Sequence, residues 1–569
     1  MTVASDYERS VQTLNESLAG KLDGQILDPD RADDGGHFSS DLGFAGSSTD
    51  SFNLLAQLAL TYVTPESRYF EDDEILERIR RAAAFQRRVQ RPSGLVDLHG
   101  ANFDSPPDTA FAVSTVARVA RMVRDSDVDG SDEVESALRP FLVDTAEGTA
   151  DGGFHTANHR WVIVDAIAKV HELYPREALL EQLERYLAET IDINEDGEYT
   201  ERSHAIYTNI VNRHLIGASL ALDRPALLDP VRRSLHSMMD LMDDDWTVVT
   251  AFSSRRDRDR QTVPVRGAAN FYFVARRDGD ERLAAGANAL LEKGGWDRGD
   301  VAMQLLSYFA RHPEWRESDL PAGRREESFT REMADSGIWR LRDGALSATV
   351  GTQTRNVVSF SYGDAKLAGL QVLTPYFGGE FRGGDIEFED GGASVSVESS
   401  YWHEELPGYF DPLDRPVEWG ELERDARSID ERPDFDIEVG VERVDRGLDV
   451  TVSATGGLSQ VPFVVEARFQ SGGTLSFDGA TLPAPQDDPV FHESGTLYYR
   501  NGDDAISIGP GFSGHRCSDP PGADESGDLV RVLLTDWSPM ERTISIRGGS
   551  WFDLAGPEPP AGPSTGFVE

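Results

Sequence analysis

The segment DLPAGRREESFTREMADSG (319–337) separates two halves of the chain that differ in hydrophobic periodicity. Before it, apolar residues recur at three- and four-residue steps, which is the spacing of amphipathic helices. After it, apolar and polar residues alternate between Gly-rich or Asp-rich turns, which is typical of antiparallel strands. We therefore predict a helical domain at 1–320, a linker at 321–337, a β domain at 338–555 and a flexible tail at 556–569.

The helical half is predicted to form antiparallel hairpins, either as a bundle or as a closed α/α toroid. Breaks at Gly, Pro or Asp clusters delimit the candidate helices. These helices lie at 51–63, 73–90, 108–124, 159–174, 177–190, 205–222, 226–242, 280–294 and 298–312. The short, regularly spaced strands of the second half predict an antiparallel β-sandwich or stacked sheets.

Acidic residues dominate the composition, with 100 Asp and Glu against 55 Lys and Arg and a formal net charge of -45. This balance argues against a nucleic-acid partner or an anionic membrane surface, both of which favour basic faces. With 39% hydrophobic residues and nine tryptophans, the chain is folded rather than disordered. Only Lys21, Lys169, Lys293 and Lys366 are lysines, a pattern that resembles proteins of salt-in halophiles.

Cysteine use and the N-terminus point to a cytoplasmic protein. The single cysteine, Cys517, allows no intramolecular disulfide and no CxxC metal knuckle. The first residues, MTVASDYERSVQ, lack the basic and apolar regions of a secretory signal. No apolar run reaches the roughly 18 residues that a transmembrane helix needs. The oligomeric state is left open by the sequence.

Two segments carry the residues that suggest chemistry. DGGFHTANHRWV (151–162) places Asn158 and His159 at the start of a helix, and DGEYTERSHAIYTN (196–209) supplies Tyr207. An amide and an imidazole can donate hydrogen bonds to a substrate carboxylate and stabilise the enolate-like charge that develops there. A phenol can shuttle the proton. Asn158 also suits the role of helix N-cap, which requires no substrate.

These segments resemble the heparinase II/III-like polysaccharide lyases and the related oligo-alginate lyases. The resemblance rests on NHRW opening a helix, the later G-x-Y-x-E-x-S…Y segment, NFDSPPDTAF (102–111) and FSSRRDRDR (252–260). It implies an α/α toroid followed by a β-sandwich. It also implies cleavage of uronic-acid-containing oligosaccharides or polysaccharides by β-elimination.

The resemblance also assigns roles. Asn158 and His159 would neutralise the substrate carboxylate, and Tyr207 would act as general acid or base. In the family, a His-x-His motif in the β domain supplies a catalytic histidine and a zinc ligand, but this chain has no such motif. His403, in SSYWHEELPGYF (399–410), is the candidate second base, and we expect no cofactor, with the structural zinc left in doubt.

Further polar residues are candidate substrate contacts, each with a structural alternative. Asp104 and Asp108 bracket a Pro-Pro turn, where Asp108 can cap the following helix or contact sugar hydroxyls. Arginine is the usual clamp for a planar carboxylate, but in so acidic a chain it also forms salt bridges. Both interpretations apply to Arg202, Arg255 and Arg256.

Two other functions remain open. A glycoside hydrolase on an α/α toroid would need an acid/base carboxylate pair such as Glu198/Glu201 or Asp192/Asp196. Such pairs are expected by chance among 100 acidic residues. A non-catalytic carbohydrate-binding protein would keep the fold without the chemistry, because fold alone does not determine function.

Overall fold

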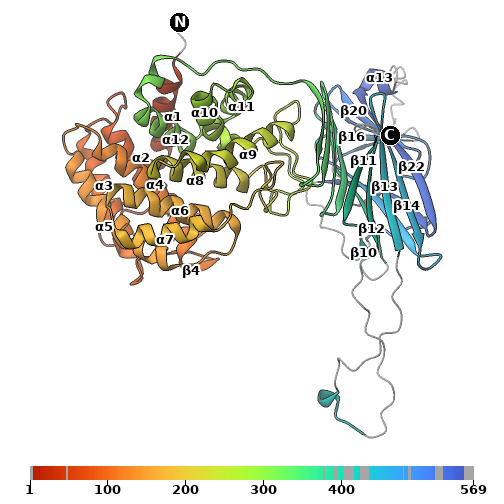
Figure 1. Cartoon of the computed structure of the whole chain (residues 1–569), viewed down its shortest axis with the longest axis horizontal. Coiled ribbons are helices and arrows are strands. Elements are labelled where there is room, and N and C mark those ends of the chain that lie inside the picture. Colours follow the sequence, from red (N-terminus) through yellow and green to blue (C-terminus); the bar gives the residue numbers. More distant parts are fainter. Residues whose placement is uncertain are drawn as a thin grey trace, which may run out of the picture. The chain divides into compact units, whose positions relative to one another are not determined.

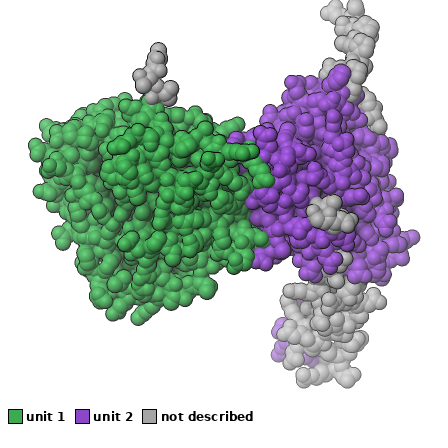
Figure 2. Space-filling model, turned by 45° about the horizontal axis from the view of Figure 1, so that its top comes forward, with its two compact units in different colours: residues 1–239, 262–326 green, residues 240–261, 327–569 purple. Residues whose placement is uncertain are grey.

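The computed structural model describes residues 4–46, 49–375, 379–389, 394–400, 416–422, 435–477, 480–484, 488–519 and 529–555. The chain divides into two compact units, which Figure 2 colours separately. The helical unit comprises 1–239 and 262–326, and the sheet unit comprises 240–261 and 327–569. The segment 240–261, which the sequence placed in the helical domain, therefore joins the sheet unit. The tail predicted at 556–569 lies outside the described residues.

The helical unit consists of consecutive helix hairpins, with α2 against α3, α4 against α5, α6 against α7 and α10 against α11 (Figure 1). Among the described residues, no helix has both the length and the apolar character to cross a bilayer. The helices are α1 Asp6–Leu22, α2 Thr49–Val63, α3 Asp73–Val89, α4 Pro106–Arg124, α5 Ser131–Asp151, α6 Ala157–Leu173, α7 Glu177–Ala188, α8 Tyr207–Leu222, α9 Leu228–Asp240, α10 Ala268–Asp278, α11 Glu281–Glu292 and α12 Gly299–Arg311. Two short hairpins pair β1 Phe38–Ser39 with β2 Phe44–Ala45, and β3 Val96–Leu98 with β4 Asn102–Ser105.

Helices α4, α6 and α8 run parallel and in register, as contacts along their lengths show. Asn158, in the first turn of α6, bonds to Glu201 just before α8. About two turns further along α6, Asp165 accepts hydrogen bonds from Ser114 of α4 and His214 of α8. Because residues at similar distances from the start of each helix contact one another, the three helices begin at the same end of the unit.

The sheet unit contains two large sheets that are antiparallel except where β18 pairs with β21 in parallel. One has the order β18-β21-β15-β9-β8-β7-β6-β5 with β10 beside β9, and the other β11-β12-β13-β14-β22-β20-β19-β16-β17. A short helix, α13 Trp551–Ala555, follows β22. The strands are β5 Ser328–Met333, β6 Ile338–Asp343, β7 Leu346–Gly351, β8 Asn356–Tyr362, β9 Ala365–Thr374, β10 Gly379–Glu380, β11 Asp385–Glu389, β12 Ser394–Ser400, β13 Phe435–Val444, β14 Gly447–Gly456, β15 Pro462–Phe469, β16 Thr474–Phe477, β17 Ala480–Pro483, β18 Val490–Phe491, β19 Leu497–Asn501, β20 Asp504–Gly509, β21 Val530–Trp537 and β22 Met540–Ser550. Strand β5 thus occupies the middle of the segment 321–337, for which we predicted a linker.

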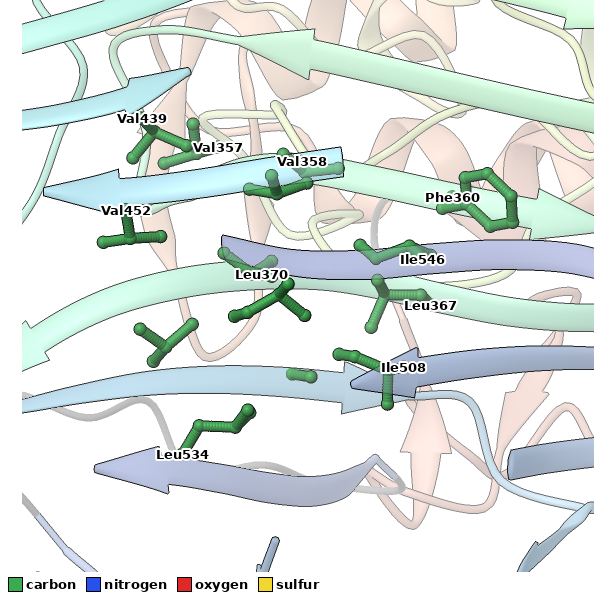
Figure 3. Close-up of a cluster of buried hydrophobic side chains, with 14 of the residues drawn as sticks. Val357, Val358, Phe360, Leu367, Leu370, Val439, Val452, Ile508, Leu534 and Ile546 are labelled. Atoms are coloured by element: carbon green, nitrogen blue, oxygen red, sulfur yellow. The ribbon is translucent and has the colours of Figure 1, made fainter. Parts of the chain in front are cut away.

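The hydrophobic core of the sheet unit lies between these two sheets (Figure 3). Val358 and Leu370 of the first sheet pack with Val452 and Ile546 of the second, and all four side chains are fully buried. In β14 buried residues alternate with half-buried ones, which is the period-two pattern of the sequence, whereas all ten residues of β9 are buried. This arrangement is a β-sandwich.

The segment 240–261 is fastened to the first sheet of this unit. Asn356 donates hydrogen bonds to Ala251 O at 2.8 Å and to the Asp259 carboxylate at 2.6 Å. Buried Arg468 pairs with the same carboxylate at 2.6 Å. These contacts explain why a segment that follows α9 in the chain belongs to the sheet unit.

Candidate active site

The candidate active site lies where α4, α6 and α8 begin. The first turn of a helix carries unsatisfied N–H groups and a partial positive charge, so it favours anions. Asp108 lies in the first turn of α4, Asn158 and His159 in that of α6, and Tyr207 is the first residue of α8. The parallel arrangement therefore brings most of the residues predicted in the helical half to one end of the unit.

Asn158 is bonded to the carboxylate of Glu201, which the sequence suggested only as half of a candidate hydrolase pair with Glu198. Its Nδ2 donates to both Glu201 oxygens, at 3.0 and 2.8 Å, and its backbone N–H donates to Glu201 Oε2 at 3.0 Å. Nδ2 also lies 2.9 Å from Thr156 Oγ1. Thr156, rather than Asn158, is the N-cap residue of α6. Asn158 is fully buried, and its Oδ1 has no partner among the described residues.

The remainder of the NHRW motif orients the segment that carries Glu201. Arg160 pairs with Glu189 at 2.6 Å and with Asp192 at 3.0 Å. Trp161 Nε1 donates to the same Asp192 carboxylate at 2.9 Å. Residues at the start of α6 thereby hold the connection between α7 and α8 in place. A short motif in this way positions a longer loop.

Arg202 and His204 are buried close to Glu198. The Arg202 Nε atom lies 3.1 Å from Glu198 Oε2, and Arg202 is only 7% exposed. Burial, with the positive charge of Arg202 adding to it, lowers the pKa of His204 to about 3. His204 is therefore neutral at physiological pH and a weak base, because a general base works best with a pKa near the working pH.

His159 and Tyr207 are the half-buried groups of the site. The ring of Phe111 lies edge-on to His159, with centroids 6.3 Å apart, and also 5.5 Å from the ring of His214. Ser203 Oγ accepts the backbone N–H of Tyr207 at 3.2 Å, which fixes where α8 begins. His159 and Tyr207 are thus more accessible than Asn158, which lies beneath the surface.

The two predicted aspartates near α4 have internal partners. Asp108 accepts from Ser105 Oγ at 2.6 Å and Asn102 Nδ2 at 2.9 Å. Ser105, not Asp108, is the N-cap residue, and the two prolines that follow it occupy the positions where a missing N–H costs nothing. Asp104 adopts a left-handed backbone with φ of 49° and accepts from Ser93 Oγ.

The other predicted residues fall in the sheet unit. Arg255 is half-buried and Arg256 is exposed, both on the segment 240–261. On the same segment, Asp259 pairs with Arg468 at 2.6 Å, and Asp257 accepts from Ser253 at 2.6 Å. His403 lies outside the described residues. Within the described ranges, no group of three or more His, Cys, Asp or Glu side chains is arranged to hold a metal.

Comparison with known proteins reveals similarity only at the level of structure. No protein-family model matches the sequence, and no curated protein matches it. The structure is similar to Paenibacillus xanthan lyase, with a TM-score of 0.60 and 9% identity over 95% of this chain and 56% of that chain. The chain thus spans little more than half the length of that lyase.

Two further solved structures cover a larger share of the neighbour. Streptomyces coelicolor chondroitin AC lyase in complex with chondroitin sulphate aligns with a TM-score of 0.52 and 10% identity, over 98% of this chain and 81% of that chain. A chondroitinase AC lyase studied in oligosaccharide complexes aligns at 0.52 and 9%, over 95% and 82%. At these identities the likeness concerns the fold. The predicted fold class is confirmed: the chain has a helical toroid followed by an antiparallel β-sandwich, the arrangement found in these solved structures.

Proposed function

We propose that the protein is a polysaccharide lyase that cleaves uronic-acid-containing glycans by β-elimination. The observation that carries this proposal is the position of Asn158, His159 and Tyr207 in the first turns of parallel helices α6 and α8. Amide, imidazole and phenol groups at the positive ends of two helices suit a reaction that builds negative charge beside a carboxylate. The fold shared with xanthan and chondroitin AC lyases supports the same reaction class.

In the proposed mechanism the substrate carboxylate binds at the start of α6. His159 donates to it directly. Nδ2 of Asn158 exchanges its bond to Thr156 for one to the carboxylate, while Glu201 keeps the amide oriented. Glu201 is in this account a positioning residue, and its own carboxylate already occupies the backbone N–H of Asn158. These donors stabilise the charge that develops on the carboxylate when the neighbouring C5 proton leaves.

The elimination itself requires one proton transfer in each direction. A base removes the C5 proton, the electron pair forms the C4–C5 double bond, and the C4–oxygen bond breaks. Tyr207 protonates the leaving glycosidic oxygen and becomes a phenolate. The phenolate regains a proton either by taking the C5 proton itself or from the conjugate acid of a second base that has taken it. His403 is proposed as that second base, and Arg255 and Arg256 as additional contacts of the substrate carboxylate.

The test is ultraviolet absorbance of the conjugated double bond, measured with a panel of uronate oligosaccharides in molar KCl. Tyr207→Phe should abolish the signal, whereas Tyr69→Phe, the same change on a half-buried ring elsewhere in the helical unit, should leave it unchanged. Asn158→Ala should lower kcat by roughly 100-fold or more, the scale seen when one oxyanion donor is removed. New reducing ends without absorbance would instead identify a hydrolase and refute the elimination.

The composition adds a salt dependence to this proposal. A net charge of -45 strains a folded chain in dilute buffer, and a Debye length of roughly 3 Å at molar salt removes most of that repulsion. Screening also lets an acidic protein approach a polyanionic glycan. Activity is therefore expected to rise with KCl concentration, and maximal activity at low salt would contradict this part of the proposal.

A further inference from the structure

A second polar pocket lies in the helical unit, away from the first turns that form the candidate active site. It has a volume of about 240 Å³ and is bounded by α4, α6, α8 and α12. Lys169 lies 11 residues after Asn158 on α6, which at 1.5 Å per residue is about 16 Å along the helix axis. Five cationic side chains line it, and we call it the cationic pocket: Arg118, Arg121, Lys169, Arg213 and Arg311.

Two of these cations are neutralised by carboxylates at the rim. Arg121 pairs with Asp125 at 2.6 Å and with Glu172, and Arg311 pairs with Glu172 at 2.8 Å. Both carboxylates also line the pocket. The rim is therefore close to balanced, with two cations against two anions.

A third cation, Lys169, is neutralised by Asp165, which lies one turn earlier on α6. Its ammonium lies 2.7 Å from Asp165 Oδ2, which also accepts from Ser114 at 2.6 Å and from His214 at 2.7 Å. Burial lowers the pKa of His214 to about 3, so this histidine adds no charge. The single negative charge of Asp165 therefore balances Lys169 and does not neutralise a further cation.

Arg118 and Arg213 remain without a carboxylate. In the part of the chain that the structure describes, Arg118 forms no hydrogen bond or ion pair, and the Nε of Arg213 is buried without a partner. The side chain of Arg213 has only a long contact, 3.4 Å, to His214. Burial and the charge of Arg118 lower the pKa of Arg213 to about 10, although Asp300 and Asp165 raise it.

This leaves an excess of two positive charges around one pocket, five cations against Asp125, Glu172 and Asp165. The excess is notable because the chain as a whole carries 100 acidic and 55 basic side chains. A buried or half-buried charge without a partner is costly, so such groups are normally paired or bind a ligand. Guanidinium groups match the oxygens of carboxylate, sulfate and phosphate groups in geometry as well as charge.

We propose that the cationic pocket is a binding site for a small oxyanion ligand, separate from the candidate active site. Arg118 and Arg213 contact the oxyanion, and the Lys169 ammonium contributes from the floor. The volume lies just below the roughly 300 Å³ at which small-molecule sites usually begin, which suits a compact ligand. The oxyanion is carried either by an inorganic anion or by a sugar acid, two sources with the same recognition chemistry.

The experiment measures binding to the full chain at constant KCl concentration by calorimetry and by thermal unfolding. The probes are inorganic sulfate, galacturonate and, as the uncharged counterpart, galactose. Sulfate or galacturonate should bind saturably and raise Tm, whereas galactose should do neither. Tighter binding of galacturonate identifies a sugar acid as the source, and binding of sulfate alone identifies an inorganic anion.

Arg118→Gln is the decisive variant. It should weaken binding of the preferred probe at least tenfold, while raising the Tm of the ligand-free protein, because it removes a charge that Lys169 and Arg213 repel. Arg277→Gln, the same charge change at an exposed position of α10, should leave both quantities unchanged. Absence of saturable binding by both anions, or unaltered affinity in Arg118→Gln, would overturn the proposal. None of these readouts depends on lyase activity.

Discussion

Two of the four lysines in the chain are buried in ion clusters, one in each unit, and the clusters differ in charge balance. In the sheet unit Lys366 lies 3.0 Å from both Asp243 and Asp245, and Arg340 lies 2.8 Å from Asp243. Two cations therefore meet two anions. In the helical unit Lys169 has one carboxylate, Asp165, and two of the four arginines around the same pocket, Arg118 and Arg213, form no ion pair among the described residues.

The pKa values follow this balance. Burial by itself would lower the pKa of Lys366, but Asp243 and Asp245 raise it above its ordinary value. Burial lowers the pKa of Lys169 to about 7, because desolvation outweighs the increase that Asp165 provides, and the charges of Arg118 and Arg213 lower the pKa further. The same side chain is thus stabilised as a cation in one unit and destabilised in the other.

The comparison separates a structural cluster from a binding site. The sheet cluster adjoins a cavity of only about 50 Å³, and Arg340 also bonds Asp240 O and Met242 O, so it fastens the segment 240–261. The helical cluster adjoins a pocket of about 240 Å³ and has an excess of positive charge. The closed and neutral cluster stabilises the fold, whereas the open cluster with excess positive charge is the proposed oxyanion site.

The largest effect is expected when the balanced cluster loses its lysine. Lys366→Met removes the buried cation that pairs with half-buried Asp243 and Asp245, and removing one partner of a buried ion pair costs about 3–5 kcal/mol. Lys169→Met should cost less, about 1–2 kcal/mol, because Ser114 and His214 still donate to Asp165. Urea unfolding measures both free energies.

The matched control for these two variants is Lys21→Met, at the half-buried last turn of α1. It should change the free energy of unfolding by no more than about 0.5 kcal/mol. If Lys169→Met destabilised the protein as much as Lys366→Met, the two clusters would be equivalent and the comparison would fail.

A smaller effect on stability is expected when alanine replaces a glycine, either beside the Lys169 cluster or in a strand of the sheet unit. A Cβ at Gly217 would lie 2.2 Å from Asp165 Oδ1 and 2.9 Å from Lys169 Nζ, so Gly217→Ala should cost about 1–3 kcal/mol. At Gly440, in β13, the nearest atom to an added Cβ lies 4.0 Å away. Gly440→Ala should therefore be neutral or stabilising by up to about 1 kcal/mol. Thermal unfolding of the two variants distinguishes a cluster without spare room from an open sheet position.

The smallest effect is a pH dependence confined to the helical unit. Lys169 has a folded pKa of about 7, below its unfolded value, so its ammonium is lost as the pH rises through 7. Sulfate affinity should then fall between pH 6 and pH 8.5, by about tenfold, equivalent to about one pKa unit of coupling. Lys366 stays charged over this range. The titratable and charged groups that face Lys169 are Asp165, Arg118, Arg213, His214 and Tyr308.

This dependence is measured by calorimetry in buffers of different ionisation enthalpy. Above pH 7, anion binding should take up a proton, because the ligand restores the charge of Lys169. In Arg118→Gln the transition should move to higher pH, since a neighbouring cation has been removed. Affinity that is constant from pH 6 to pH 8.5 would rule out Lys169 as a contributor.

Periodicity predicted most of the helices that have one apolar face, although amphipathic α1 was not among them, and two other helices were missed for identifiable reasons. Helices α2 and α3 were predicted to within two residues of their observed ends. Helix α10 was not predicted, because residues 268–275 are all buried and the segment has no polar stripe. Helix α5 was also missed, since Pro140 interrupts it and proline ordinarily ends a helical pattern.

The candidate site was predicted in part. Asn158, His159 and Tyr207 were identified from their motifs, and the structure places them in the first turns of adjacent helices. Glu201 was named only as half of a chance carboxylate pair with Glu198, and its bond to the Asn158 amide was not predicted. Nothing in the sequence distinguishes this glutamate from the other acidic residues, because its importance depends on where the loop before α8 docks.

The sequence by itself determined the class and order of the two halves, because hydrophobic periodicity is a local property of the chain. It also determined the scarcity of lysine and the excess of acidic residues. Only the tertiary structure decided which charges become neighbours. Arg118, Lys169, Arg213 and Arg311 lie on four different helices, and they surround one pocket because those helices pack side by side. Electrostatic balance depends on distance in space, which sequence separation does not reveal.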